Sequence, residues 1–173
     1  SSDLFGEVAL EVEGPDRNSI PTDQRIHSME TGDSDPGLVT LLFDFGRYLM
    51  IASSRPGALP PNLQGLWTTA RYDEEKQQFD YYTPWNGDYH TNINVQMNYW
   101  PVHVAGLDPC SDPLVDLIRG MAKAGTETAR IQHGCRGWTV HTIHNVWGFT
   151  APGWEASWGH FPMAGPWMTR HLW

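Results

Sequence analysis

The feature that most constrains the fold is a set of apolar segments with helical spacing, two of which begin at an Asp-Pro dipeptide. Behind Asp35-Pro36, apolar side chains recur every three or four positions over residues 36–54. Asp favours the N-cap and Pro suits the first helical position, so a helix should begin there. The same start predicts a second helix over 112–132, although two internal glycines lower its helicity, and a third is expected over 164–172. The fold class is therefore mainly α.

The remaining segments lack helical periodicity. Residues 5–14 alternate between apolar and acidic side chains, which predicts a half-buried β-strand. Residues 15–35 are rich in Pro, Asp, Ser and Gly, so we expect a linker with a short helix after Thr22. The segments 55–100 and 134–163 are long and aromatic, and loops of this length are uncommon in compact domains unless they are functional. Helices joined by loops that build a site are the expected architecture.

Composition excludes several classes of partner. The net charge is −9, and nucleic acids and anionic membranes both require basic surface, so neither is expected to bind. No run approaches the roughly 18 apolar residues of a transmembrane helix, so membrane insertion is not expected. Nine Trp residues are unusual for 173 residues. Core packing accounts for most of them, but indole rings also stack on the apolar faces of sugars.

The two cysteines are predicted to be free and buried. A helix fills the space between Cys110 and Cys135, and at about 1.5 Å per residue it holds them roughly 30 Å apart. A disulfide requires Cα atoms within about 7 Å.

One candidate site lies in residues 85–94. In an extended chain, His90, Asn92 and Asn94 point to the same face. An imidazole and two carboxamides suit a ligand covered in hydroxyls, because amides both donate and accept hydrogen bonds. Loop Asn side chains also commonly satisfy nearby backbone groups, and this structural role stays open.

A second candidate is Glu155, which stands between Trp154 and Trp158. Desolvation between two indoles would raise the pKa of a carboxyl toward that of a general acid, although a surface Glu is the commoner case. His141 and His144 have a spacing that helps metal binding only on a helix, and their β-branched neighbours favour a strand. We therefore expect no metal and no other cofactor.

The sequence resembles glycoside hydrolase family 95, the inverting 1,2-α-L-fucosidases. The resemblance consists of short stretches that follow in order along most of the chain: FGRYL at 45–49, SSRPG at 53–57, NLQGLW at 62–67, DYHTNINVQMNYWP at 88–101, PLVDLI at 113–118, GWTVH at 137–141, WGFTAP at 147–152, SWG at 157–159 and HLW at 171–173.

The resemblance implies an (α/α)6 barrel of which this chain holds the opening helices. Residues 1–35 would be the strand and linker before the catalytic domain, and residues 36–173 its N-terminal portion. The implied substrate is a fucosylated oligosaccharide or glycan whose α-1,2-linked L-fucose is released with inversion and without metal. An extracellular or periplasmic location is expected from the family alone.

The resemblance also implies roles for individual residues. An Asn side-chain carbonyl acts as the base in this family, polarised by a neighbouring Asn and by an Asp. These two Asn map onto Asn94, the expected base, and Asn92, its positioning partner, although the order could be reversed. Substrate binding is expected of four further residues, namely His90, Glu155, Trp158 and Trp67.

Two catalytic groups of the family have no counterpart here. The general-acid Glu normally lies in a Ser-Pro-Glu stretch, and neither this stretch nor the motif of the activating Asp occurs in the 173 residues. We therefore expect a piece of a longer enzyme that is inactive by itself. Residues 141–145 also depart from the His-His-Asn-Thr-Asp run of some members. The alternatives are an α-L-galactosidase of the same family and a non-catalytic carbohydrate-binding or structural module.

Overall fold

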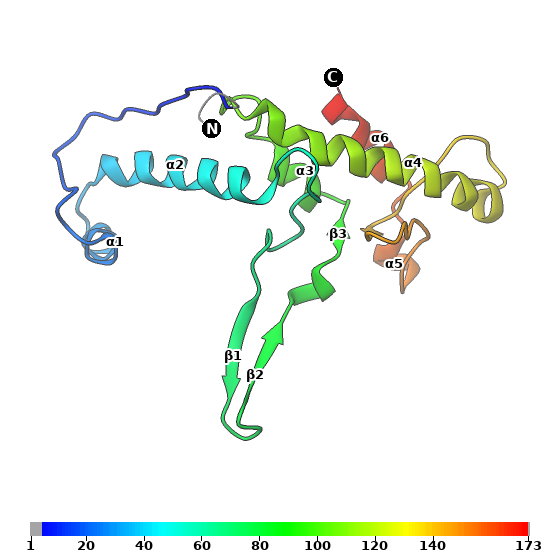
Figure 1. Ribbon diagram of the computed structural model, residues 1–173, viewed down its shortest axis with the longest axis horizontal. Coiled ribbons are helices and arrows are strands. Elements are labelled where there is room, and N and C mark those ends of the chain that lie inside the picture. Colours follow the sequence, from blue (N-terminus) through cyan, green and yellow to red (C-terminus); the bar gives the residue numbers. More distant parts are fainter. Residues whose placement is uncertain (1–4, 173) are drawn as a thin grey trace.

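The computed structural model describes residues 5–172 and is mainly helical (Figure 1). Its α-helices are α1 (Thr22–Glu30), α2 (Pro36–Ser53), α3 (Asn94–Tyr99), α4 (Asp112–His133), α5 (Ala156–Gly159) and α6 (Ala164–Thr169). Short 3-10 turns occupy Pro84–Gly87, Asp108–Ser111 and Arg170–Leu172. Four short strands form two antiparallel pairs, β1 (Thr69–Asp73) with β2 (Gln78–Tyr82) and β3 (Tyr89–His90) with β4 (Ile143–His144).

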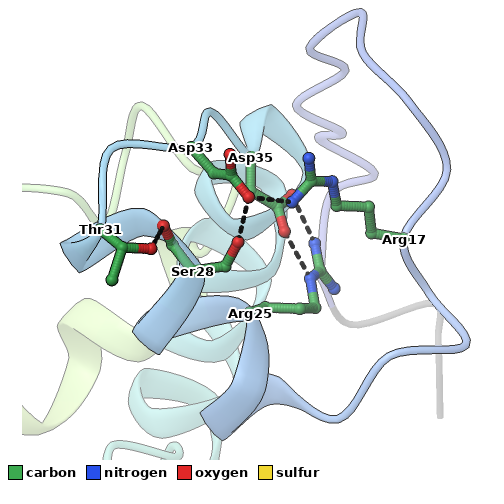
Figure 2. A network of polar contacts seen from close by, with 6 residues as sticks. All are labelled: Arg17, Arg25, Ser28, Thr31, Asp33 and Asp35. Carbon is green, nitrogen blue, oxygen red and sulfur yellow. Dashed lines mark hydrogen bonds and ion pairs between the residues drawn. The ribbon is translucent and has the colours of Figure 1, made fainter.

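Helix α2 begins where the sequence predicted, but Asp35 does not cap it with its side chain. The Asp35 carboxylate instead accepts two hydrogen bonds from Arg25 of α1, from Nε at 2.7 Å and from Nη2 at 2.8 Å (Figure 2). Both side chains are buried. The hydrogen bonds to Arg25 hold the pKa of Asp35 below its usual range, and those to Asp35 raise the pKa of Arg25. The ion pair thus fastens α1 to the start of α2.

The same corner holds the linker before α2. Arg17 lies 3.7 Å from the carboxylate of Asp33, and Ser28 Oγ donates a hydrogen bond to that carboxylate (Figure 2). Thr31 Oγ1 donates to the carbonyl of Ser28 at 2.8 Å. The predicted short helix after Thr22 is confirmed as α1, and these contacts order the turn that follows it.

Helix α4 runs unbroken over 22 residues despite its two glycines. Gly125 has a structural purpose, because a Cβ at this position would lie 2.1 Å from the carbonyl oxygen of Thr139. Because glycine has no Cβ, the helix can approach Thr139 more closely than it could with any other residue at this position. Asp112 is the first helical residue and Ser111 the N-cap, one residue earlier than the sequence suggested. The helix ends at Gly134, which adopts the left-handed conformation.

The core forms where α3, α4 and α6 meet the segment around Leu107. Its fully buried side chains include Val95, Val102, Leu107, Cys110, Leu114, Met121, Val140 and Met168. Buried polar groups at its edge are paired. Ser54 Oγ donates to the carbonyl of Cys110 at 2.8 Å and accepts from the hydroxyl of Tyr99 at 2.7 Å. Burial also raises the pKa of Tyr99.

The predicted strand at 5–14 is wrong. These residues run along the surface without strand pairing, and Val8 and Val12 are 36% and 41% exposed. A backbone hydrogen bond of 2.8 Å from the Gly6 amide to the Gly106 carbonyl ties down the start of the segment. Alternation alone does not make a strand, because the backbone groups need a partner strand, and none lies beside residues 5–14 in the part of the chain that the structure describes.

The β1–β2 hairpin was missed within the segment 55–100. It projects away from the helices (Figure 1), and both of its faces carry exposed side chains, which removes the alternation that marks a half-buried strand. Asp73 Oδ1 accepts backbone hydrogen bonds from Glu75 and Lys76 at 3.0 Å each and so closes its turn.

The cysteine prediction is confirmed in part. Both thiols are free, and Cys110 is buried, but Cys135 is exposed because it lies beyond the end of α4. Among the described residues, no helix is both long and apolar enough to cross a membrane.

Candidate functional site

The pairing of β3 with β4 brings the two candidate segments together. His90 lies opposite Ile143, and the pairing continues as the Thr91 amide donates to the Thr142 carbonyl at 2.8 Å. Thr142 Oγ1 in turn donates to the carbonyl of Trp158 at 2.6 Å. Three segments that are distant in the sequence therefore meet around His90. This arrangement depends on backbone pairing that cannot be predicted from any local sequence motif.

His90 has two close neighbours. Its Nε2 lies 3.0 Å from Oδ1 of Asp88, and both side chains are nearly buried. Its ring meets the indole of Trp158 edge-on, with the ring centroids 6.3 Å apart and the planes at 87°. Burial raises the pKa of Asp88, while His90 acts in the opposite direction. Asp88 had not been singled out from the sequence, because a lone Asp before a strand carries no distinguishing signal.

The two predicted catalytic Asn residues lie close in the chain but not on one extended strip. The chain turns at residues 91–93, and Asn94 is the first residue of α3. The expectation that His90, Asn92 and Asn94 share a face of an extended chain is therefore wrong. Asn92 is exposed and Asn94 is half-buried. Thr91, which precedes Asn92, is fully buried, and its carbonyl accepts a hydrogen bond from Gln96 Nε2 at 2.6 Å.

The side chains of Asn92 and Asn94 differ in their hydrogen bonding from those of Asn62 and Asn145. Asn62 donates to the Gly87 carbonyl at 2.9 Å, and Asn145 Oδ1 accepts from two backbone amides at 3.1 Å, as structural loop Asn residues do. Over residues 5–172, neither Asn92 nor Asn94 makes a side-chain hydrogen bond of this kind. Their carboxamides are therefore open to water or to a ligand.

Glu155, Trp158 and Trp67 have different environments. Glu155 is exposed at the N-cap of α5, so the desolvated position between two indoles that the sequence suggested is absent. Trp158 contacts His90 and also stands edge-on to Trp154, with ring centroids 5.3 Å apart. Trp67 packs over Gly65, whose missing Cβ makes room for the ring, and its side chain is 44% exposed.

A cavity of about 520 Å³ lies beside the Asp88–His90 pair. Four aromatic residues line it, namely Tyr89, Trp147, Phe149 and Trp154, together with three Asn residues and Asp88. Apolar walls with a few polar groups are typical of sites for small organic ligands, sugars included. Sequence reasoning missed these residues as a set because they come from three loops, which the cavity joins only after folding.

The backbone around this cavity is strained. Asn86, which lines the cavity, and Trp85 before it adopt positive φ angles of 60° and 49°, and Trp154 adopts 55°. Residues other than glycine rarely adopt this left-handed conformation, which costs of order 1–3 kcal/mol and clusters at functional sites.

Three histidines converge at a different place. Nitrogens of His133, His141 and His160 lie within 4.8 Å of one another, a spacing compatible with a metal ion. However, the Phe161 amide donates to Nδ1 of His141 at 3.0 Å, which leaves the ring proton on Nε2, 3.1 Å from His133. A ligating imidazole instead donates its second N–H to an acceptor, so His141 Nε2 is unsuited to metal. Burial and the other two histidines lower the pKa of His141 to about 4.

His141 and His144, which the sequence did not favour as a metal pair, make separate contacts. His144 is buried on β4, and its Nδ1 donates to the carbonyl of Phe149 at 2.7 Å. Its strand position agrees with the β-branched neighbours seen in the sequence.

The sequence matches the glycosyl hydrolase family 95 catalytic domain over residues 1–173. Similar proteins include Alpha-L-fucosidase 2 of Arabidopsis thaliana, 40% identical over 98% of this chain and 20% of its own length. Probable alpha-fucosidase A of Aspergillus niger is 39% identical over the same shares, and that of Aspergillus oryzae is 40% identical over 68% of this chain and 15% of its own. The chain belongs to glycosyl hydrolase family 95. It spans about a fifth of the length of these relatives.

Proposed function

We propose that the protein containing this chain hydrolyses α-1,2-linked L-fucosides with inversion, and that the chain supplies the base side of its active site. The observation that carries the proposal is the state of Asn92 and Asn94, whose carboxamides have no structural hydrogen bond in residues 5–172, beside the Asp88–His90 pair. The relatives that share this region are named as α-fucosidases. The substrate is then a fucosylated oligosaccharide or glycan.

In this mechanism, Asn94 accepts a proton from the attacking water through its side-chain carbonyl. An inverting glycosidase needs such a base on one face of the sugar and an acid for the leaving oxygen on the other. An amide is a very weak base by itself, so Asn92 orients it and a carboxylate elsewhere in the enzyme polarises it. That carboxylate and the general acid are expected outside these 173 residues, in a longer chain that completes an (α/α)6 barrel. The 173 residues alone are expected to be inactive.

The sugar is held by the remaining site residues. His90 and Glu155 bind its hydroxyls, and Trp158 presents an indole edge next to His90. Trp67 is proposed to contribute a further aromatic contact. An extracellular or periplasmic location is part of the proposal, because substrates of this kind occur there.

The test uses the full-length enzyme and an aryl α-L-fucoside. Asn94→Ala should lower kcat by about three orders of magnitude with a smaller change in KM, because it removes a group that acts in the transition state. Asn18→Ala, at an exposed loop position far from the site in the sequence, is the matched control and should behave as the parent. Turnover by Asn94→Ala within about tenfold of the parent would exclude Asn94 as the base. Proton NMR of the first product formed must show the β-anomer of L-fucose.

Two alternatives are separated by the same assays. Preferential hydrolysis of the aryl α-L-galactoside, which differs from the fucoside by one hydroxyl, would indicate an α-L-galactosidase of the same family. Binding of fucosylated glycans without any turnover by the full-length protein would indicate a non-catalytic module.

A further inference from the structure

We propose that Asp88 is a positioning residue that holds the imidazole of His90 in the orientation in which it meets a ligand. The inference rests on the proposed function, in which His90 binds hydroxyls of the sugar. It extends that function by assigning a role to a residue outside the predicted site.

The contact between the two side chains is exclusive. Asp88 Oδ1 and His90 Nε2 face each other at 3.0 Å, and the side chains are only 13% and 11% exposed. Both atoms are shielded from solvent, and within residues 5–172 neither forms a hydrogen bond, so the 3.0 Å approach is an electrostatic contact without hydrogen-bond geometry. Buried polar atoms are costly to leave without a partner, and in this part of the chain the facing side chain is the closest compensation that either atom has.

A second contact fixes the plane of the His90 ring. The indole of Trp158 stands edge-on to it, and the Trp158 carbonyl is itself held by Thr142. The backbone of His90 is fixed by the β3–β4 pairing. The imidazole therefore has the Asp88 carboxylate 3.0 Å from one nitrogen and the Trp158 indole on a second side, and these two neighbours restrict its orientation.

The environment of the pair differs from that of an ordinary surface pair. His103 and Asp108 lie closer, at 2.6 Å, but their side chains are 62% and 73% exposed, and such pairs contribute little to stability. Burying the carboxylate of Asp88 carries a desolvation cost that the surface pair avoids. Asp88, unlike His90, also lines the 520 Å³ cavity. A costly, buried pair with one member at a cavity is better explained by ligand binding than by stability.

The experiment compares Asp88→Asn, His90→Ala and the double variant in the full-length enzyme, with Asp108→Asn as the matched control. We expect Asp88→Asn to lower kcat/KM for an aryl α-L-fucoside about 10- to 100-fold, the loss typical of removing a group that orients a functional histidine. The double variant should be no worse than His90→Ala, because Asp88 acts through His90. Asp108→Asn should remain within about twofold of the parent. Independent, multiplying losses or parent-like activity of Asp88→Asn would overturn the proposal.

His90→Gln separates positioning from folding. Its amide can face Asp88, so the melting temperature should stay near that of the parent while kcat/KM falls at least about tenfold. Parent-like activity of His90→Gln would show that the pair is only structural. Should Asp88→Asn fail to fold, Asp88→Glu takes its place in the cycle, because it keeps the carboxylate and displaces it relative to His90; parent-like activity of Asp88→Glu would overturn the proposal.

Failure of the proposed function gives a different pattern. If the parent cleaves the α-L-galactoside instead of the fucoside, the substrate is wrong, and the same variants are compared on the galactoside. If it cleaves neither, binding of L-fucose by calorimetry replaces turnover in the same cycle. A parent that neither cleaves nor binds these sugars overturns both proposals.

Discussion

The close crossing at Gly125 leads to a quantitative prediction for α4. An added Cβ would lie 2.1 Å from the Thr139 carbonyl oxygen, whereas ordinary contact begins at 3.4 Å, so one backbone segment must move by about 1.3 Å. Thr139 also donates its amide to the Gly125 carbonyl at 3.2 Å, so the movement strains a hydrogen bond as well. Overpacking of this kind costs about 1–3 kcal/mol, and a clash with backbone belongs at the upper end.

Gly120 offers a control in the same helix. A Cβ there meets nothing within 4 Å, so Gly120→Ala should stabilise α4 by up to about 1 kcal/mol through helix propensity. Gly125→Ala has the same gain in helix propensity, so the net decrease in its free energy of unfolding should be about 2 kcal/mol. The two variants should therefore differ by about 3 kcal/mol in the same assay.

The assay is hydrogen exchange of the full-length protein, followed by mass spectrometry on peptides covering residues 112–133. Gly125→Ala should speed exchange there by about two orders of magnitude relative to Gly120→Ala, since each 1.4 kcal/mol corresponds to a factor of ten. Equal protection in the two variants would refute the reasoning, because it would mean that Thr139 does not limit the space beside α4.

Three further predictions concern charge and burial. Asp35→Asn should destabilise the protein at pH 7, and the loss of stability should shrink as the pH falls below about 4. The reason is that a carboxylate with a lowered pKa contributes stability only while it stays ionised. Urea unfolding at several pH values measures this loss, and a loss that does not depend on pH would contradict the prediction. His141 has a lowered pKa, so the parent should lose stability as the pH falls from 6.5 to about 4. His141→Gln should reduce this loss when the melting temperature is measured across that pH range. The same decrease in melting temperature in parent and variant would argue against a buried, neutral His141. Cys135 should react with a maleimide in the native protein and Cys110 only after denaturation, because Cys110 is buried and burial also raises its pKa. Peptide mapping identifies the labelled thiol. Labelling of Cys110 in the native protein would contradict its position in the core.

Local signals in the sequence were sufficient for the longer helices, whereas α3 and α5 were missed within segments expected to be loops. The apolar periodicity behind Pro36 and Pro113 marked α2 and α4 to within a few residues, because helical hydrogen bonds join residues four apart and need no distant partner. The last helical segment was found on the same grounds, and the short α1 was expected within the linker without such periodicity. Family membership was also present in the sequence, as ordered short motifs.

Tertiary structure decided the features that depend on contacts between distant segments. Alternation at 5–14 was a true local pattern, but a strand also needs a partner, and none lies beside it in residues 5–172. Asp35 had the residue type of a cap, but Arg25 is placed to take its carboxylate instead. The requirement for Gly125 appeared only with Thr139 beside it.

The candidate site divides in the same way. Residue types alone showed that an imidazole and two carboxamides stand close together in the chain at residues 90–94. Folding then places Asp88 and Trp158 beside His90, puts Asn92 in a turn at 91–93 and Asn94 at the start of α3, and brings three loops around one cavity. The physical reason is that residue types are local, whereas the distance between two side chains far apart in the sequence is set by the backbone pairing and packing of the whole chain.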